Sequence, residues 1–209
     1  MAGAGGAALA IAAIRGGAVG SLPCAMLTPA QLAAQVAEVH AAAHGPLNLN
    51  FFCHHLPEPA PDERAWHALL APYYAEEGVE PGPVPPLRRP FDEALCAAVE
   101  KARPAIVSFH FGLPGEALVA RVRGTGALVF GNATTPEEMR WLAARGVDAV
   151  IAQGAEAGWH SGWLLGAAHR PTPLAALLAE EIAVPVIAAG GIVDGADIAR
   201  ALAAGASAV

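Results

Sequence analysis

The sequence predicts an α/β protein built as a (β/α)₈ barrel, also called a TIM barrel. Short apolar runs rich in β-branched residues alternate along the chain with longer runs rich in alanine and leucine. The apolar runs are continuous, which is typical of parallel strands buried on both faces. Nearly every run ends in glycine or a polar residue, whereas a doubly wound sheet gathers such residues at one switch point. The barrel is therefore favoured over the doubly wound sheet.

The strands follow from the apolar runs in chain order. Each run is short and is bounded by glycine, proline or polar residues, as strands are. The expected strands are Ala18–Leu22, Leu47–Phe52, Ala105–Phe111, Ala127–Phe130, Asp148–Ala152 and Pro185–Ala189. Because helical runs separate them, we expect the strands to pair in parallel through right-handed crossovers.

Capping residues mark where the intervening helices begin. Threonine caps a helix, and proline tolerates the first helical position because its missing N–H has no partner there. Such Thr-Pro pairs occur at 28–29, 135–136 and 172–173. The expected helices are Pro29–Ala43, one from Pro136, Leu174–Ile182, and one from Asp194 or Asp197 to about Gly205. The apolar opening, Met1–Ile14, is interpreted as a Gly-rich loop and a buried helix, because a signal peptide would begin with basic residues.

Composition and charge exclude several classes of protein. The 209 residues carry 12 basic and 19 acidic side chains, for a net charge of −7, and 55 % of them are hydrophobic. These values exclude intrinsic disorder and argue against a nucleic-acid partner. No stretch of about 18 residues is apolar and free of Gly, Pro and charge, so no membrane span is expected. Three cysteines without a CxxC motif indicate neither disulfides nor zinc, which fits a cytoplasmic protein.

One long segment interrupts the alternation of strands and helices. Residues 54–90 are rich in proline and contain a helical patch at Ala65–Glu77. The segment is too long for an ordinary βα loop. It is either a surface excursion or a lid, and the lid is favoured because the segment leaves from the carboxyl end of a strand.

The stretch from Ala152 to Gly162 carries the strongest functional signal. A buried strand runs into a loop with glycines at 154, 158 and 162, which permit positive φ and close approach to a flat ligand. Gln153 offers hydrogen-bond donors and acceptors. His160 is a candidate general base, because an unperturbed imidazole titrates near neutral pH.

His110 is a second candidate, in the strand Ser108–Gly112. Strand alternation places Ser108 and His110 on one face, and Phe109 and Phe111 on the other. A histidine in a buried strand needs a partner. His110 is therefore either a hydrogen-bonded core residue or a group that faces the substrate, and the sequence leaves both open.

Two further signals concern binding. Gly190 and Gly191 follow a strand and precede a helix, so their backbone N–H groups are candidates to bind a phosphate. Asn48 and Asn50 point the same way from an apolar strand, and at least one is expected to contact a ligand. No metal site is expected, because His40 and His44 end an ordinary alanine-rich helix without other ligands nearby.

Four motifs together resemble the FMN-dependent nitronate monooxygenases. These motifs are SFHFGLP (108–114), GNATTPEE (131–138), AQGAEAGWH (152–160) and PVIAAGGI (185–192), and the likeness covers essentially the whole chain. The resemblance implies an FMN-binding TIM barrel. Met1–Ala4 resembles the end of the family's first strand.

The resemblance also implies roles for individual residues. His160 matches the catalytic base of the family, and His110 would line the substrate side. The implied flavin contacts are Met1, Ala2, Gly3, Asn50, Gln153, Gly158, Gly190 and Gly191, the last two at the phosphate.

The chain departs from the family pattern in two places. The family usually has Gly-Gly-His where this chain has Gly158-Trp159-His160, and the indole would either narrow the pocket or point outward. The family also continues through an eighth strand into a Gln-x-Gly-Thr phosphate loop. We therefore expect one incomplete FMN-binding domain over 1–209, cut in strand 1 and at strand 8, with exposed strand edges at the seam and residues 54–90 inserted after strand 3.

The activity that the resemblance implies is oxidation of alkyl nitronates, such as propionate 3-nitronate, by O₂. The products would be a carbonyl compound and nitrite or nitrate. The alternatives are an NAD(P)H:quinone reductase, a flavin-type enoyl-ACP reductase, and an inactive fragment. Partners are expected to be the small nitronate or nitroalkane substrate and O₂, and a homodimer stays an open option.

Overall fold

The computed structural model describes residues 5–58, 62–83, 87–166 and 168–209. The chain divides into a larger unit, 1–54 with 90–209, and a smaller unit, 55–89. Met1, Ala2 and Gly3, which were expected to contact the flavin, lie outside the described residues.

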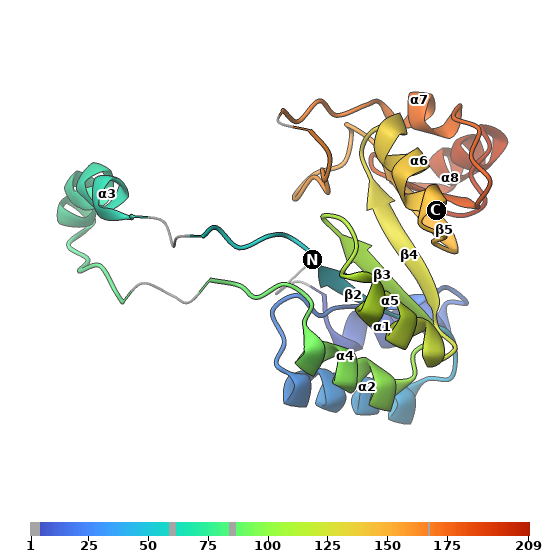
Figure 1. The fold of residues 1–209 in the computed structure, drawn as a ribbon, viewed down its shortest axis with the longest axis horizontal. Coiled ribbons are helices and arrows are strands. Elements are labelled where there is room, and N and C mark those ends of the chain that lie inside the picture. The colour runs from blue at the N-terminus through green and yellow to red at the C-terminus, as the bar shows by residue number, and fades with distance from the viewer. Residues whose placement is uncertain (1–4, 59–61, 84–86, 167) are drawn as a thin grey trace. The chain divides into compact units, whose positions relative to one another are not determined.

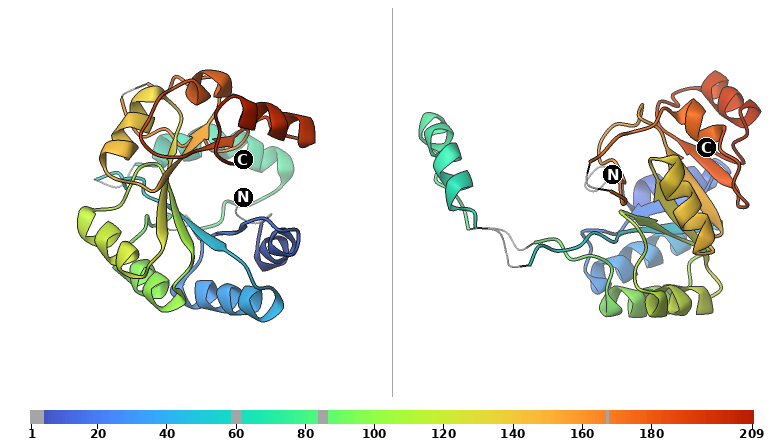
Figure 2. Two further views of the ribbon diagram at one scale, coloured as in Figure 1. Left: turned by 90° about the vertical axis from the view of Figure 1, so that its right-hand side faces the viewer. Right: turned by 45° about the horizontal axis from the view of Figure 1, so that its top comes forward.

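Six parallel strands form the larger unit, paired in the order in which they occur in the chain. They are β1 (Gly20–Pro23), β2 (Leu47–Phe52), β3 (Ile106–His110), β4 (Leu128–Ala133), β5 (Ala149–Gln153) and β6 (Val186–Ala189). The sheet curves into an open arc with helices around its outside, which is a half-barrel (Figure 2, left). All six expected strands are confirmed. β4 and β5 run past their expected ends, which places Asn132 and Gln153 on strands.

The connecting helices agree with the expected caps in most places. The helices are α1 (Ala7–Arg15), α2 (Pro29–Ala42), α4 (Glu93–Ala102), α5 (Glu116–Gly124), α6 (Pro136–Ala144), α7 (Leu174–Leu178) and α8 (Gly195–Ala203) (Figure 1). Thr28, Thr135 and Asp194 cap α2, α6 and α8 with their side chains.

The cap expected at Thr172 is wrong. The side chain of Glu156, from the preceding loop, accepts the hydrogen bond of the Leu174 amide at 2.9 Å instead. The helix also ends at Leu178 rather than at Ile182. Ile182 packs against the core from an irregular segment, so tertiary contacts replace helical hydrogen bonds there.

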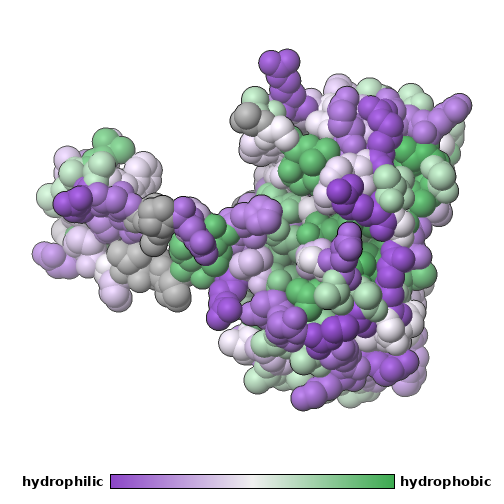
Figure 3. All heavy atoms as spheres, viewed as in Figure 1, coloured by the Kyte–Doolittle hydropathy of each residue, from purple (hydrophilic) through white to green (hydrophobic). Residues whose placement is uncertain are grey.

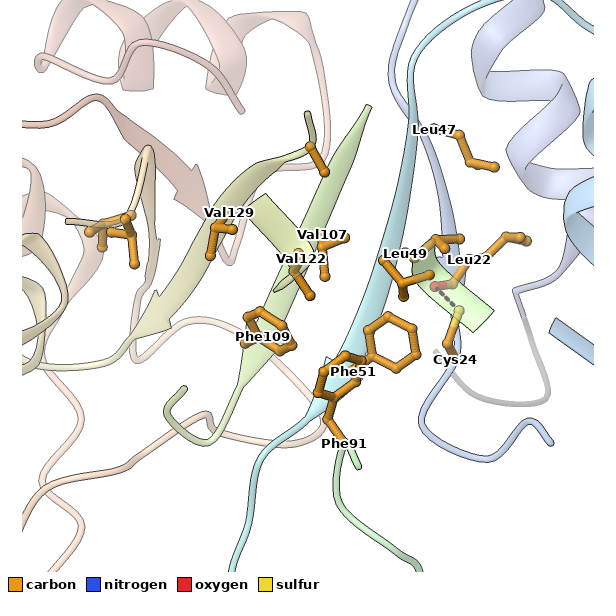
Figure 4. Packing of buried hydrophobic residues seen from close by; sticks show 14 of the residues in the cluster. Leu22, Cys24, Leu47, Leu49, Phe51, Phe91, Val107, Phe109, Val122 and Val129 are labelled. Atoms are coloured by element: carbon orange, nitrogen blue, oxygen red, sulfur yellow. Dashed lines mark hydrogen bonds between the residues drawn. The ribbon is translucent and has the colours of Figure 1, made fainter. Parts of the chain in front are cut away.

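The core lies between the sheet and the helices. Phe51 and Phe109 point outward from β2 and β3 and meet the ring of Phe91, with centroids 4.8 and 5.2 Å from it (Figure 4). The expectation that strands are buried on both faces is wrong for β1 and β2, where only the outer side chains are fully buried. Their inner faces carry Ser21, Asn48 and Asn50, and polar side chains tolerate partial exposure.

The two edges of the sheet differ. Beyond β6, Ile187 and Ala208 form an isolated parallel bridge, in which the Ala188 amide donates to the Ala208 carbonyl oxygen at 2.8 Å. Among the described residues, no strand pairs with the outer edge of β1. The sheet is therefore open at β1, while residues near 208 begin to cover β6.

The smaller unit contains α3 (Arg64–Glu77), which confirms the expected helical patch to within one residue. None of its described residues is buried, and Trp66, Leu69 and Tyr73 are exposed. The role of this unit as a lid stays a prediction.

Apolar and polar residues are interspersed on the viewed surface (Figure 3). No helix in the described ranges is both long and apolar enough to cross a membrane.

Candidate active site

Aromatic and imidazole rings gather at the carboxyl edge of the sheet, where β2, β3 and β5 end. Phe52 ends β2, and its ring centroid lies 5.6 Å from that of His110 at the end of β3. The loop after β5 brings His160 to 5.7 Å from the same phenyl ring. Phe111 and His54 complete the cluster, with ring centroids 6.4 Å apart. The structure therefore brings both predicted catalytic histidines together.

The end of β3 departs from the expected alternation. Phe109 points into the core as expected, but Phe111 does not share its face. The backbone of Phe111 has φ of 66°, in the left-handed region that non-glycine residues rarely adopt. This turn ends the strand and brings the Phe111 ring to 4.5 Å from the ring of His110.

His110 is held neutral by its surroundings. Burial lowers the pKa of His110 to about 4, and electrostatic repulsion from the neighbouring His160 acts in the same direction, while a hydrogen bond to the His160 backbone opposes both. The ring atom Nε2 is buried and has no hydrogen-bond partner among the described residues. A buried nitrogen without a partner fits a group that meets a ligand better than a satisfied core histidine.

The side chain of Gln153 holds the loop that carries His160. Its Oε1 accepts hydrogen bonds from Asn132 Nδ2 at 3.0 Å and from the Gly162 amide at 2.9 Å. Its Nε2 donates to the carbonyl oxygen of His160 at 2.8 Å. Most of the hydrogen-bonding capacity of Gln153 is therefore used within the protein, and its role as a flavin contact stays a prediction.

The loop glycines serve close packing rather than positive φ. Gly154, Gly158 and Gly162 all lack a positive φ, so that part of the expectation is wrong. A Cβ atom at Gly162 would lie 2.0 Å from Asn132 Nδ2 and 2.8 Å from His110 Cε1. The loop thus lies directly against β3 and β4. Gly158 has open space around it.

Trp159 occupies the strained position of this loop. Its φ is 70°, and it is 70 % exposed, with its ring 5.7 Å from that of His160. A left-handed conformation costs an ordinary residue roughly 1–2 kcal/mol. Of the two orientations considered for the indole, the structure has the outward one. His160 is also exposed to solvent.

The predicted phosphate site lies after β6. Gly190 and Gly191 have φ of 111° and 69°, and a Cβ at Gly190 would lie 2.9 Å from the Ala157 amide nitrogen. Within the described ranges, the amides of these two glycines donate no hydrogen bond to another protein atom. They border a cavity of about 290 Å³ between α7 and α8. Their φ values and free amides suit an anion.

The start of α8 contributes little to that site. The carboxylate of Asp194 accepts hydrogen bonds from the amides of Ala196 and Asp197, and the carboxylate of Asp197 accepts from those of Val193 and Asp194. The amides of Ala196 and Asp197 in the first turn are therefore occupied, and two carboxylates lie there. Any phosphate donors come from the glycines rather than from the helix.

A polar network lines the inner face of the sheet. Ser108 Oγ accepts from Asn48 Nδ2 at 2.9 Å and from Asn50 Nδ2 at 2.8 Å. Asn48 also donates to Ser21 Oγ, while its own Oδ1 is buried without a partner among the described residues. Both asparagines thus have protein partners, and contact of Asn50 with a flavin stays a prediction.

The comparison with known proteins decides the family. The model of the family described as nitronate monooxygenase matches residues 1–209. The chain belongs to this family. A nitronate monooxygenase from Paraburkholderia phytofirmans is 39 % identical over 216 residues, covering 100 % of this chain and 59 % of that protein. One from Pseudomonas aeruginosa is 42 % identical over 212 residues, covering 97 % and 60 %.

Solved structures agree with the family and the fold. A nitroalkane oxidase from Streptomyces ansochromogenes superposes with a TM-score of 0.88 at 36 % identity, over 100 % of this chain and 61 % of that one. FabK from Thermotoga maritima gives 0.71 at 25 % identity, over 100 % and 54 %. The chain is thus homologous to oxidoreductases, and it spans about three-fifths of the length of the curated relatives.

Sequence reasoning overlooked two residues of this candidate site. Asn132 is buried in β4 and bonds Gln153, and the rule applied to Asn48, that a polar residue in an apolar strand needs a partner, would have found it. Glu138 is fully buried in α6 and bonds the loop, but no signal in the sequence separates it from its exposed neighbour Glu137.

The thiols and potential metal ligands contribute no chemistry here. Cys24, Cys53 and Cys96 are free and buried. Burial raises the pKa of Cys24 to about 12 and raises that of Cys53 further, so these two remain thiols at neutral pH. Across the described residues, no group of three or more His, Cys, Asp or Glu is arranged to hold a metal ion.

The left-handed backbone at position 159 predicts that glycine gives a more stable protein there than alanine, which reverses the usual order. Trp159→Gly should be more stable than Trp159→Ala by about 0.5–1 kcal/mol, because only glycine adopts a left-handed φ without strain. Urea unfolding measures the difference. At Arg140, exposed in α6, the alanine variant should be the more stable one because glycine weakens helices. Equal stability of the two variants at position 159 would contradict the prediction of a strained backbone there.

The low pKa of His110 predicts a pH dependence of stability. The unfolded state takes up a proton near pH 6.5 and the folded state only near pH 4, so stability falls as the pH is lowered between these values. The loss amounts to at most about 3 kcal/mol. His110→Gln should flatten the unfolding free energy over this range, whereas His44→Gln, at an exposed position, should not. Parallel curves for wild type and His110→Gln would refute the assignment.

Proposed function

We propose that the protein containing this chain oxidises alkyl nitronates with FMN and O₂, yielding a carbonyl compound and nitrite or nitrate. The observation that supports this most is the pairing of exposed His160 with neutral His110 at the carboxyl edge of a family-typical half-barrel. Small anionic nitronates, of the propionate 3-nitronate type, are the proposed substrates.

The residues present fit FMN. Gly190 and Gly191, which border the cavity between α7 and α8, would hold the phosphate with their free amides. Asn50, Gln153 and Gly158 would lie along the flavin, and Met1, Ala2 and Gly3 are proposed as contacts by resemblance. The unpartnered Nε2 of His110 offers a further polar contact. Bound FMN supplies the redox chemistry, which the side chains of this site do not provide.

The side chains of this chain transfer the proton and exclude water from the reacting atoms. His160 removes the α-proton of a neutral nitroalkane, since its imidazole is exposed at the carboxyl edge of the sheet and a histidine side chain is the commonest general base. A nitronate is already deprotonated and does not need this step. His110 stays uncharged and donates or accepts a hydrogen bond, while Phe52 and Phe111 keep water from the reacting carbon.

A flavin-dependent reductase is the second candidate. The same half-barrel superposes on FabK, so the scaffold is not restricted to nitronate oxidation. The two reductases considered are an NAD(P)H:quinone reductase and an enoyl-ACP reductase.

A cytoplasmic location and a homodimer remain part of the proposal.

Anaerobic mixing separates these candidates. With FMN bound, a nitronate alone should bleach the visible flavin absorbance rapidly, while NADH should not, because the proposed electron donor is the nitronate. Stopped-flow spectroscopy measures both rates. Rapid bleaching by NADH but not by nitronate would favour the reductase, and failure to bind FMN would favour an inactive fragment.

Removal of the proposed base predicts a split between substrates. His160→Asn should lower kcat/KM for a neutral nitroalkane by about 100-fold or more, because general bases contribute at least that much. Oxidation of the preformed nitronate and FMN affinity should change far less. His44→Asn serves as the control. Unchanged nitroalkane turnover in His160→Asn would refute the role of His160.

A further inference from the structure

We infer that Glu138 is a positioning residue, which holds the loop after β5 against the carboxyl edge of the sheet. The described residues of this loop, 154–166 and 168–173, are here called the His160 loop. Its consequence for catalysis rests on the proposed function. Glu138 touches no reacting atom in this scheme and acts through the loop.

The carboxylate of Glu138 is fully buried and fully hydrogen-bonded. Oε2 accepts from the Thr134 amide at 2.7 Å and from Thr134 Oγ1 at 2.8 Å. Oε1 accepts from the amides of Leu164 and Leu165 at 2.7 and 3.0 Å. The exposed fraction of the residue is 0 %. Burying a carboxylate without partners costs free energy, and the four hydrogen bonds to this one side chain offset that cost.

The position of Glu138 on α6 makes it a rigid anchor. Thr135 caps this helix through a hydrogen bond from the Glu138 amide, so the first turn is fixed by its own bonds. The carbonyl oxygen of Thr134 also accepts the Thr172 amide at 3.2 Å, at the far end of the His160 loop. The middle and the end of the loop are therefore both tied to the turn that joins β4 to α6.

Gln153 supplies the other attachment. It holds the carbonyl oxygen of His160 and the amide of Gly162, and Glu138 holds the two amides that follow shortly after. Both anchors lie outside the segment from His160 to Leu165. Without Glu138, the amides of Leu164 and Leu165 would lose their acceptor. The segment would keep the bonds of Gln153, the hydrogen bond of His110 to the His160 backbone and the contact of Ser161 Oγ with His169. The His160 ring would then be held less firmly beside Phe52.

Glu137 is a matched control within the same helical turn. Its side chain is 70 % exposed and pairs only loosely with Arg140, at 3.5 Å. Glu137→Gln removes the same charge from the same helix N-terminus as Glu138→Gln. Any effect of charge on the helix dipole is therefore shared by the two variants, while the contacts with the loop are not.

Hydrogen exchange tests the anchor directly. Glu138→Asp keeps the charge and remains near Thr134 but is one methylene too short to reach Leu164 and Leu165 as well. Glu138→Gln places an NH₂ group against donor groups. In the whole protein, peptides covering 158–166 should exchange at least about 10-fold faster in both variants, with β2 and β3 unchanged. Glu137→Gln should match wild type. Unchanged exchange in Glu138→Asp overturns the inference, even if Glu138→Gln fails to fold.

Substrate comparison tests the positioning of His160. Glu138→Asp should lower kcat/KM at least about 10-fold for a neutral nitroalkane, which needs the base, and much less for the nitronate. Equal losses with both substrates would show that Glu138 supports the fold without positioning His160, and would overturn the inference. Inactivity of the wild-type protein toward both substrates would refute the proposed function, while the exchange experiment would still decide whether Glu138 anchors the loop.

Discussion

Parallel pairing of adjacent strands is the constraint on which the site depends. Because all six strands run in the same direction, each loop that follows a strand leaves from the same edge. Phe52 pairs with His110 in the register of β2 and β3, and Gln153 pairs with Ala189 in that of β5 and β6. Residues far apart in the sequence therefore meet, and the positions of their Cα atoms follow from backbone hydrogen bonds rather than from contacts within the site.

The His160 loop takes its shape from polar side chains that belong to the frame around it. An amide on β5 and a buried carboxylate on α6 make four of the hydrogen bonds that hold its backbone between His160 and Leu165. A buried polar group stabilises the fold only when all its hydrogen bonds are made, because a missing partner leaves an unsatisfied charge or dipole. Such groups therefore restrict the positions of the atoms that they bind. The described part of the loop between β5 and α7 contains no helix or strand, so these side-chain bonds replace the hydrogen bonds of regular structure.

The rigid frame also explains why strain persists where it does. Three non-glycine residues in the described ranges have positive φ, and two of them, Phe111 and Trp159, flank the histidine pair. Such conformations survive when surrounding contacts over-determine the backbone. Around Trp159 these contacts are the hydrogen bonds of Gln153 with His160 and Gly162. At Phe111 they are the ring packing with His110 and Phe52. The strain brings aromatic side chains to a place that regular strand geometry would not reach.

Local sequence was sufficient for the strands and several of the helices of this protein, but α4 and α5 were not among the expected helices. Apolar runs and capping residues determined six strands and most helix starts, because hydrophobic burial and unsatisfied helix ends act over a few residues. They also indicated His110, His160 and the glycine pair as candidates. Only the tertiary structure decided that Glu156 caps α7, that Phe111 turns toward His110, and that Asn132 and Glu138 hold the loop. Those outcomes depend on which groups become neighbours across the sheet, and Glu137 and Glu138 differ in nothing but the side of the helix they occupy.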